Sequence, residues 1–309
     1  MIPEPLAGLD VLQRGWLSSN NLLVHAARGE PGAVLVDTGH VNHAPQTVGL
    51  VRQALGGRPL ARIVNTHLHS DHCGGNAALQ RAFGAPISVP PGEADAARAW
   101  EEPALSHHLT GQRIERFAVD ALLAPGEPFV AGGREWQVIA APGHDPHSVM
   151  LFDAASGVLA TADALWENGF GIVFPEIAGE PGFDDVAAVL ETIAALPVRL
   201  VIPGHGAPFT DVRAALARAR GRLQGLRADP ARHAQHALKV LIKYHLMEEG
   251  SQADRALTAW ALATPLVAGL WARFAPAGVA TAAGWVEAVV ADLVAGGALR
   301  RAGDTVFDA

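Results

Sequence analysis

Short apolar runs alternate with helical patterns over the first two hundred residues. Runs of β-branched and apolar residues between Gly, Pro or Asn predict strands, and apolar residues three or four positions apart predict helices. The predicted strands are 21–26, 33–38, 62–66, 87–89, 136–140, 149–152, 158–161 and 199–202. The predicted helices are 46–55, 76–83 and 185–196, the last with Asp184 as its N-cap. Strands that alternate with helices predict an α/β fold built in layers.

The pattern changes after His205. Long stretches rich in Ala, Leu and Arg predict helices, and two short apolar segments around Gly303-Asp304 predict a hairpin. The helices are 211–227, 231–249, 254–274 and 282–295, and the hairpin strands are 298–301 and 305–307. Helices followed by a short hairpin predict a winged-helix-like module. We therefore expect two domains, 1–210 and 211–309.

Composition limits the classes of protein that fit. The chain has 309 residues, of which 50% are hydrophobic, so it can bury a sizeable core. No uncharged apolar stretch is long enough for a transmembrane helix, and residues 1–23 lack the pattern of a secretory signal. The single cysteine, Cys73, is compatible with a reducing compartment. We expect a cytoplasmic protein with no membrane partner.

Charge is distributed unevenly along the chain. Residues 1–212 carry 11 Lys/Arg and 23 Asp/Glu, a net charge of −12, whereas residues 213–309 carry 12 and 8, a net charge of +4. An acidic main body disfavours broad electrostatic binding of nucleic acid. The helix predicted at 282–295 contains two acidic residues and no basic one, so a lid, packing or dimerisation role for the tail is favoured over DNA recognition.

The segment His67-Leu68-His69-Ser70-Asp71-His72 is the most informative in the sequence. It follows a predicted strand and precedes Cys73-Gly74-Gly75, where the two glycines allow a tight turn. Three imidazoles and one carboxylate within six residues provide nitrogen and oxygen donors, both of which zinc accepts.

Three further donors stand at or just after predicted strand ends, near Gly or Pro. They are His144 in Ala141-Pro142-Gly143-His144, Asp163 at the end of 158–163, and His205 in Pro203-Gly204-His205-Gly206. Ligand sites of layered α/β proteins gather at strand ends. We therefore expect these donors to join the first cluster.

The sequence from Thr66 to Gly75 resembles the signature loop of the metallo-β-lactamase superfamily. Asp37-Thr38-Gly39 is similar to an early strand-end motif of that family, and the later His, Asp and His follow its order. The likeness covers roughly residues 10–210 and implies a four-layer αββα sandwich.

The resemblance also implies a ligand set for two zinc ions. One ion would take His67, His69 and His144, and the other Asp71, His72 and His205. Asp163 would bridge the two ions, and Asp37 would orient a ligand. Cys73 stands at a position that the family does not use. A histidine at position 69 favours zinc over a di-iron site, and iron or manganese remain possible as in glyoxalase II.

The implied function is hydrolysis of an ester, thioester or lactone bond in a small molecule. A hydroxide that bridges the zinc ions would attack the carbonyl, and Asp71 would act as the catalytic carboxylate that handles the proton. The presence of Asp163 makes the pattern more similar to the glyoxalase II, lactonase and nuclease branches than to true β-lactamases. The alternatives are a metal-dependent nuclease acting on RNA or DNA, a DNA-binding regulator, and a mononuclear-iron sulfur dioxygenase. A homodimer is also possible.

Several other residues have both a functional and a structural interpretation. Trp166, Phe170, Ile172 and Phe174 could line an apolar pocket or pack in the core with equal justification. Packing on a helix face is favoured for Tyr244, and exposure on a connecting segment for His107 and His108. The remaining candidates are expected to be structural or surface residues: His25, His40, His43 and His147.

Overall fold

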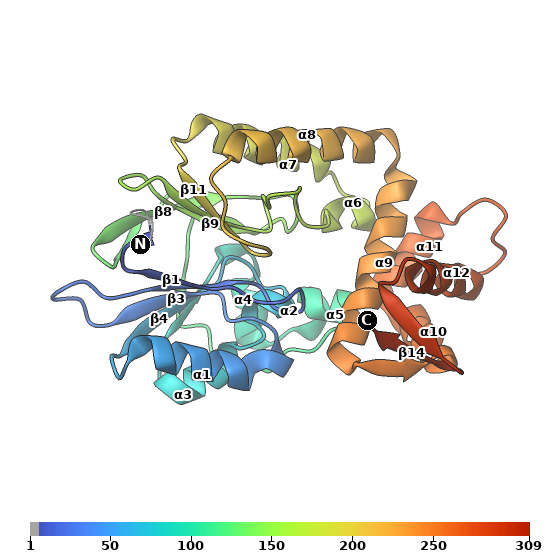
Figure 1. Cartoon of the computed structure of the whole chain (residues 1–309), viewed down its shortest axis with the longest axis horizontal. Coiled ribbons are helices and arrows are strands. Elements are labelled where there is room, and N and C mark those ends of the chain that lie inside the picture. The colour runs from blue at the N-terminus through green and yellow to red at the C-terminus, as the bar shows by residue number, and fades with distance from the viewer. Residues whose placement is uncertain (1–5) are drawn as a thin grey trace.

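Two mixed β-sheets lie face to face at the centre of the computed structural model, which describes residues 6–309 (Figure 1). The first sheet has the order β1 (Leu9–Leu12), β2 (Asn21–Val24), β3 (Ala33–Val36), β4 (Leu60–Val64), β5 (Ile87–Val89), β6 (Ala121–Leu122). Strands β1 to β3 pair antiparallel, and β3 to β6 pair parallel. The parallel strands are connected by crossovers, which is why helices cover the outer face.

The second sheet has the order β11 (Leu200–Pro203), β10 (Val158–Ala162), β9 (Val149–Asp153), β8 (Arg134–Ala140), β7 (Phe129–Ala131). Only β10 and β11 pair parallel. Side chains from both sheets interdigitate between them, including Trp136, Leu151 and Val64, which are fully buried. Burial of this apolar surface is the main stabilisation of the sandwich.

Helices cover the outer face of each sheet (Figure 1). On the first sheet lie α1 (Ala44–Leu55) and α3 (Asn76–Phe83), and on the second lie α7 (Phe183–Ala195) and α8 (Val212–Ala228). The layers confirm the predicted αββα sandwich. Shorter helices are α2 (Ser70–Cys73), α4 (Pro91–Ala99), α5 (Ser106–Thr110), α6 (Phe174–Ala178) and the 3₁₀ turns η2 (Val41–His43) and η3 (Glu102–Ala104).

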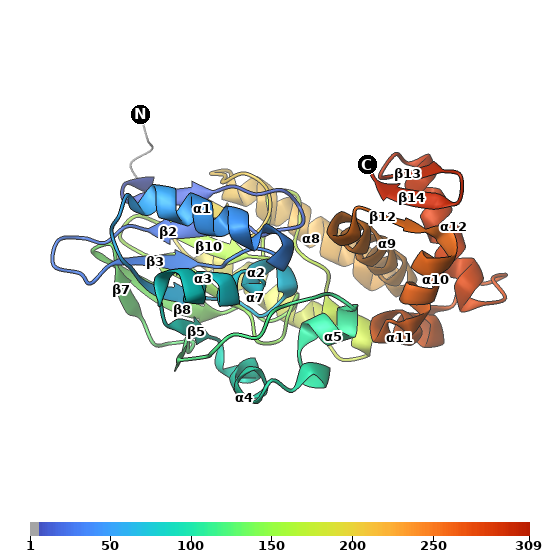
Figure 2. The same cartoon turned by 90° about the horizontal axis from the view of Figure 1, so that it is seen from below.

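The C-terminal region forms a helical unit at one end of the sandwich (Figure 2). Its elements are α9 (Pro230–Glu249), β12 (Ser251–Ala253), α10 (Asp254–Ala263), α11 (Pro265–Phe274), α12 (Ala282–Ala295), β13 (Leu299–Ala302) and β14 (Thr305–Asp308). The three strands form a small sheet in the order β12-β14-β13, and the helices share a separate apolar core. From residue 6 to residue 309, each helix is too short or too polar to cross a bilayer.

Two predictions about the helices are wrong. The single helix expected at 254–274 is wrong, because it is divided at Thr264-Pro265 into α10 and α11. Proline lacks the amide hydrogen that a continuous helix needs and restricts the preceding residue to extended backbone. The prediction of Asp184 as an N-cap is also wrong, since it lies inside the first turn of α7. The amides of Gly182 and Phe183 instead donate to Oε1 of Glu176.

Candidate metal centre

Three imidazoles converge behind the C-terminal end of β4. His67 and His69 lie in the segment that follows this strand, and His144 lies in the loop after β8. Nδ1 of His69 lies 3.1 Å from Nε2 of His67 and 2.8 Å from Nε2 of His144. Nitrogens that share one zinc ion at about 2.1 Å are separated by ~3.0–3.4 Å. These three nitrogens therefore have the arrangement of a common ligand set.

A second cluster lies beside the first and contains Asp71, His72, Asp163 and His205. Oδ2 of Asp71 is 2.9 Å from Nε2 of His205 and 3.6 Å from Nε2 of His72. Nε2 of His72 is buried and has no hydrogen-bond partner within residues 6–309. An orphaned nitrogen of this kind, aimed at two carboxylates, is what a cation site requires.

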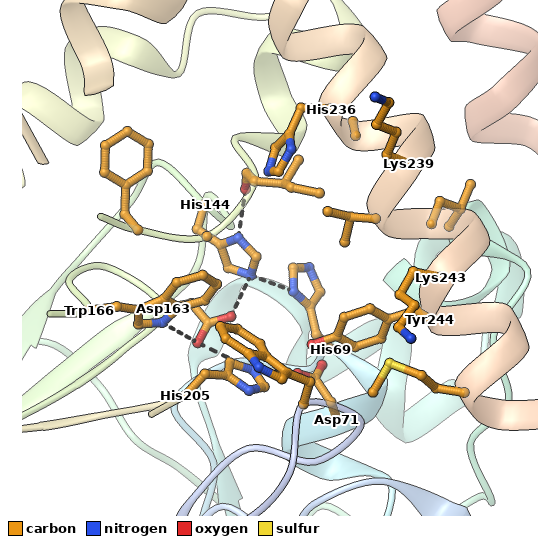
Figure 3. Close-up of a pocket in the computed structure, with 18 of the residues that line it drawn as sticks. His69, Asp71, His144, Asp163, Trp166, His205, His236, Lys239, Lys243 and Tyr244 are labelled. Carbon is orange, nitrogen blue, oxygen red and sulfur yellow. Dashed lines mark hydrogen bonds and ion pairs between the residues drawn. The ribbon is translucent and has the colours of Figure 1, made fainter. Parts of the chain in front are cut away.

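The Asp163 carboxylate faces both clusters. Its Oδ1 lies 3.4 Å from Nε2 of His72. Its Oδ2 lies 3.4 Å from Nε2 of His144 (Figure 3). The structure thus brings together the seven donors that the sequence analysis selected, from four different strand exits. Cys73 does not point to either cluster, because its Sγ contacts the carbonyl oxygen of Leu68.

Two glycines allow the backbone to pack closely against the donor side chains. A Cβ atom on Gly204 would lie 2.2 Å from Oδ1 of Asp163, and one on Gly171 would lie 2.3 Å from Nδ1 of His144. Only glycine permits such an approach without displacing the donor. The Pro203-Gly204-His205 sequence therefore both ends β11 and leaves space for the Asp163 carboxylate.

Residues around the clusters orient the imidazole rings. Nδ1 of His72 donates to Oδ2 of Asp37 at 2.7 Å, which is the role expected for Asp37. Nδ1 of His144 lies 2.6 Å from the carbonyl oxygen of Ile172. Asp145, which the sequence analysis did not select, places Oδ2 3.6 Å from Nε2 of His69. Its position directly after the candidate ligand His144 was the only sequence signal for this role.

The electrostatic environment divides the donors into neutral and charged groups. Burial and the neighbouring rings of His72, His69 and His144 hold the pKa of His67 well below its usual value. Burial also lowers the pKa of His69, to about 4, so both rings are neutral and offer lone pairs. Burial raises the pKa of Asp71, but His72 and His205 outweigh it and bring the value to about 2.

His72 shows that negative charge is concentrated at the second cluster. Burial lowers its pKa, but the carboxylates of Asp163, Asp71 and Asp37 raise it well above the usual value. Without a metal ion, these carboxylates therefore stabilise the protonated form of His72. The neutral nitrogens of His67 and His69 in the first cluster and the mixed nitrogen and carboxylate donors of the second fit divalent transition metals such as zinc.

A cavity of about 770 Å³ opens over the clusters and extends to α8 and α9. The metal end is lined by donors of both clusters, and the opposite wall by side chains of α9 (Figure 3). Tyr244 projects from α9 toward His69 and Asp71 (Figure 3). The sequence favoured packing on a helix face for Tyr244, but the side chain lines the cavity, which agrees with the alternative that it reaches the site. Helical periodicity shows that residues share a face but not what that face covers.

Aromatic and apolar side chains form the remaining walls. Trp166, Phe170, Ile172 and Phe174 all line the cavity, so the pocket interpretation is correct, and Phe170 also belongs to the core. Trp16, which was not selected from the sequence, is half exposed and stacks on the His205 ring with 5.3 Å between centroids.

Among the histidines outside the two clusters, His236 of α9 lines the cavity, whereas the six that the sequence singled out do not. His108 is exposed as expected, but the expectation for His107 is wrong, because this side chain is buried in α5 near Trp100. The four histidines expected to be structural or surface residues do not line the cavity: His25, His40, His43 and His147.

Comparison with known proteins agrees with this geometry. The family model of the metallo-beta-lactamase superfamily matches residues 14–205, and the chain belongs to this superfamily. A hydroxyacylglutathione hydrolase of Rhodospirillum rubrum is 28% identical over 201 residues, which are 65% of this chain and 67% of that protein. A hydroxyacylglutathione hydrolase of Acidiphilium cryptum is 36% identical over 163 residues, 52% of this chain and 56% of that protein. The matches thus span about half to two thirds of the length of these relatives.

Solved structures of the same fold include two useful neighbours. A metallo-beta-lactamase family protein of Thermus thermophilus has a TM-score of 0.59 at 23% identity, covering 98% of this chain and 99% of that chain. The BLEG-1 B3 metallo-beta-lactamase has a TM-score of 0.54 at 27% identity, covering 68% of this chain and 96% of that chain. The first likeness concerns the fold and includes the C-terminal region.

Proposed function

We propose that the chain is a hydrolase that binds two zinc ions and cleaves a thioester or related carboxylic ester bond in a small molecule. The observation that carries the proposal is the Asp163 carboxylate, which turns one oxygen to each of two adjacent donor clusters. The hydroxyacylglutathione hydrolases among the relatives support a thioester as the first substrate class to test.

Bound zinc would supply Lewis acidity, which polarises an ester carbonyl and lowers the pKa of a nucleophilic water. Asp71 is held as a carboxylate by His72 and His205 and can accept a hydrogen bond from that water. The same carboxylate can carry the proton to the leaving group. Asp37 keeps His72 in the tautomer whose Nε2 faces the second cluster.

The tail contributes to substrate binding in this proposal. The Tyr244 hydroxyl forms no hydrogen bond with another residue in the described part of the chain, and burial raises its pKa well above the usual value. It therefore remains a proton donor at neutral pH and can donate to a substrate oxygen. A cavity bounded by α9 accommodates a small molecule rather than a folded nucleic acid, which favours the hydrolase over the nuclease alternative.

A turnover screen on zinc-loaded protein tests the proposal. The panel contains thioesters, lactones, β-lactams and bis-p-nitrophenyl phosphate, with the metal content measured by elemental analysis. We expect thioester or ester hydrolysis and two zinc ions per chain. Asp71→Ala and His69→Ala should abolish turnover while leaving the circular dichroism spectrum unchanged. Hydrolysis of the phosphodiester alone would support the nuclease alternative, and full activity of metal-free protein would contradict the mechanism.

A further inference from the structure

An unpaired guanidinium lies in the wall of the cavity, remote from the metal ligands in sequence. Arg222 on α8 lines the cavity and is half-buried. Between residues 6 and 309, no carboxylate lies within ion-pair distance of it. Its one recorded hydrogen bond joins Nη2 to Nε2 of His236 at 3.2 Å. Most of its five N–H donors are therefore available to a ligand.

The other two cations of the cavity lining are already neutralised. Lys239 lies 3.2 Å from the carboxylate of Asp292, and Lys243 pairs with the carboxylate of Asp308. His236 cannot act as a counterion, since an imidazole is either neutral or positively charged. Burial lowers its pKa to about 4, so the ring is neutral at pH 7 and adds no second positive charge. Arg222 is thus the cation in the cavity that lacks a compensating charge.

Packing fixes the guanidinium close to the metal end. It lies over the Phe170 ring with 5.2 Å between Cζ and the ring centroid. Gly169 and Gly171 flank this ring, and a Cβ on Gly169 would lie 3.0 Å from Nη1 of Arg222. Gly171, two residues after Gly169, packs against the ring of His144. The guanidinium of Arg222 and a donor of the first cluster therefore contact the same short backbone segment. Stacking on an aromatic ring restricts the planar fork to one orientation.

We propose that the substrate carries an anionic group, a carboxylate in the simplest case, which Arg222 binds while the scissile carbonyl lies at the metal centre. The inference rests on the proposed function for the identity of the scissile bond. A cation that is partly removed from water without a counterion is costly, and a ligand carboxylate would relieve that cost. The guanidinium fork matches a carboxylate in two parallel hydrogen bonds. Apolar side chains of the cavity lining, such as Ile172 and Phe174, suit an alkyl spacer.

Matched thioesters on the zinc-loaded full chain test this proposal. S-hexanoyl-N-acetylcysteamine has no anionic group, S-adipoyl-N-acetylcysteamine carries a carboxylate on the acyl half, and S-hexanoyl-3-mercaptopropionate carries it on the thiol half. We expect one of the two anionic substrates to have a kcat/KM higher than that of the neutral one by about 10- to 100-fold, as for a buried charge-assisted hydrogen bond. The preferred substrate identifies which half of the molecule lies against α8.

Variants of Arg222 assign the preference to this side chain. Arg222→Gln should remove the preference, and Arg222→Lys should keep part of it because the charge stays while the fork is lost. Arg220→Gln is the matched control, since Arg220 stands on the same helix, pairs with Glu191 and does not line the cavity. Equal kcat/KM for the three substrates, or a preference that survives Arg222→Gln, would overturn the proposal.

A binding measurement separates this inference from the proposed reaction. In metal-free protein, no metal ion is present to bind the carboxylate of the ligand. Trp16 and Trp166 line the cavity, so their fluorescence reports ligand binding. We expect 4-phenylbutyrate to bind more tightly than 4-phenylbutanol by at least about tenfold, and Arg222→Gln to remove the difference. Equal binding of the two compounds to wild-type protein would overturn the anion site even if thioesters are hydrolysed. Failure of every ester to react would refute only the proposed function.

Discussion

The carboxylate of Asp37 lies 2.7 Å from Nδ1 of His72 and directs Nε2 of that ring into the second donor cluster. Asp37 also has a φ of +56°, a left-handed backbone conformation that only a few residue types other than glycine tolerate. Its Oδ1 accepts a further hydrogen bond from the backbone amide of Thr66. The backbone conformation and the Thr66 hydrogen bond fix the Asp37 carboxylate, which in turn orients the His72 ring.

Removal of the Asp37 charge should weaken metal binding more than it weakens the fold. Asparagine tolerates the left-handed conformation, so Asp37→Asn isolates the loss of charge. We expect zinc affinity to fall by about 10- to 100-fold, measured by competition with a chelating dye. Asp10→Asn, at a surface pair with His25, is the control. An unchanged zinc affinity would show that Asp37 does not orient the ligand.

Gly204 should be indispensable for the bridging position of Asp163. Gly204→Ala places a Cβ where Oδ1 of Asp163 now lies, so the carboxylate must move. We expect less than two zinc ions per chain by elemental analysis and a loss of kcat of about 100-fold or more. Gly221→Ala, in open space on α8, should keep both ions and gain helix stability of about 0.5–1 kcal/mol. Full zinc occupancy in Gly204→Ala would argue against the bridging geometry.

The Tyr244 hydroxyl should contribute to catalysis through the substrate and not through the metals. Tyr244→Phe retains the ring and removes the donor, and we expect kcat/KM to fall by about tenfold with unchanged zinc content. Met247→Leu is the control, because Met247 lines the same cavity from the same helix. Steady-state kinetics and elemental analysis provide both readouts. Equal kinetics for Tyr244→Phe and wild type would leave the phenol with a packing role only.

Glu93 should make the protein less stable as the pH rises. This carboxyl is buried on α4, and burial together with Asp145 raises its pKa to about 8. Between its unfolded value near 4.5 and about 8, the folded state binds more protons than the unfolded state, so stability falls with increasing pH. Glu93→Gln should therefore raise the urea midpoint at pH 8 and have little effect at pH 4.

Metal-free protein is the appropriate sample for this measurement, since Asp145 faces His69. Asp95 is exposed on the same helix, so Asp95→Asn is the control. The change in its urea midpoint between pH 4 and pH 8 should equal that of wild type. If the urea midpoint of Glu93→Gln equals that of wild type at both pH values, ionisation of the buried Glu93 does not destabilise the fold.

The donors could be predicted from the sequence because each stands at the exit of an apolar strand. His144, Asp163 and His205 are far apart in the chain, but the strands before them lie in one sheet, so their ends share an edge. The motif at 67–72 indicated the family, and the resemblance implied how the seven donors divide between two ions. The winged-helix-like description of the tail, the domain boundary at 210 and the roles of individual ligands stay predictions.

Residues whose role depends on packing between distant elements were not predictable in this way. Tyr244, Arg222 and Trp16 reach the cavity only because α8, α9 and the loop before β2 meet there. Strand β12 was missed since Ser-Gln-Ala has no apolar alternation and pairs only through its backbone with β14. Pro265 is a sequence signal for the break between α10 and α11, but the apolar periodicity on both sides of it predicted one continuous helix.

The cavity has its metal donors on one structural unit and its opposite wall on α9 of another. The candidate metal ligands and the part of the cavity wall that α9 forms are therefore encoded in separate stretches of the gene. A mutation in α9 can alter which molecules are accepted while every metal ligand stays in place. The same catalytic sandwich could in this way acquire a new substrate through changes in a single helix.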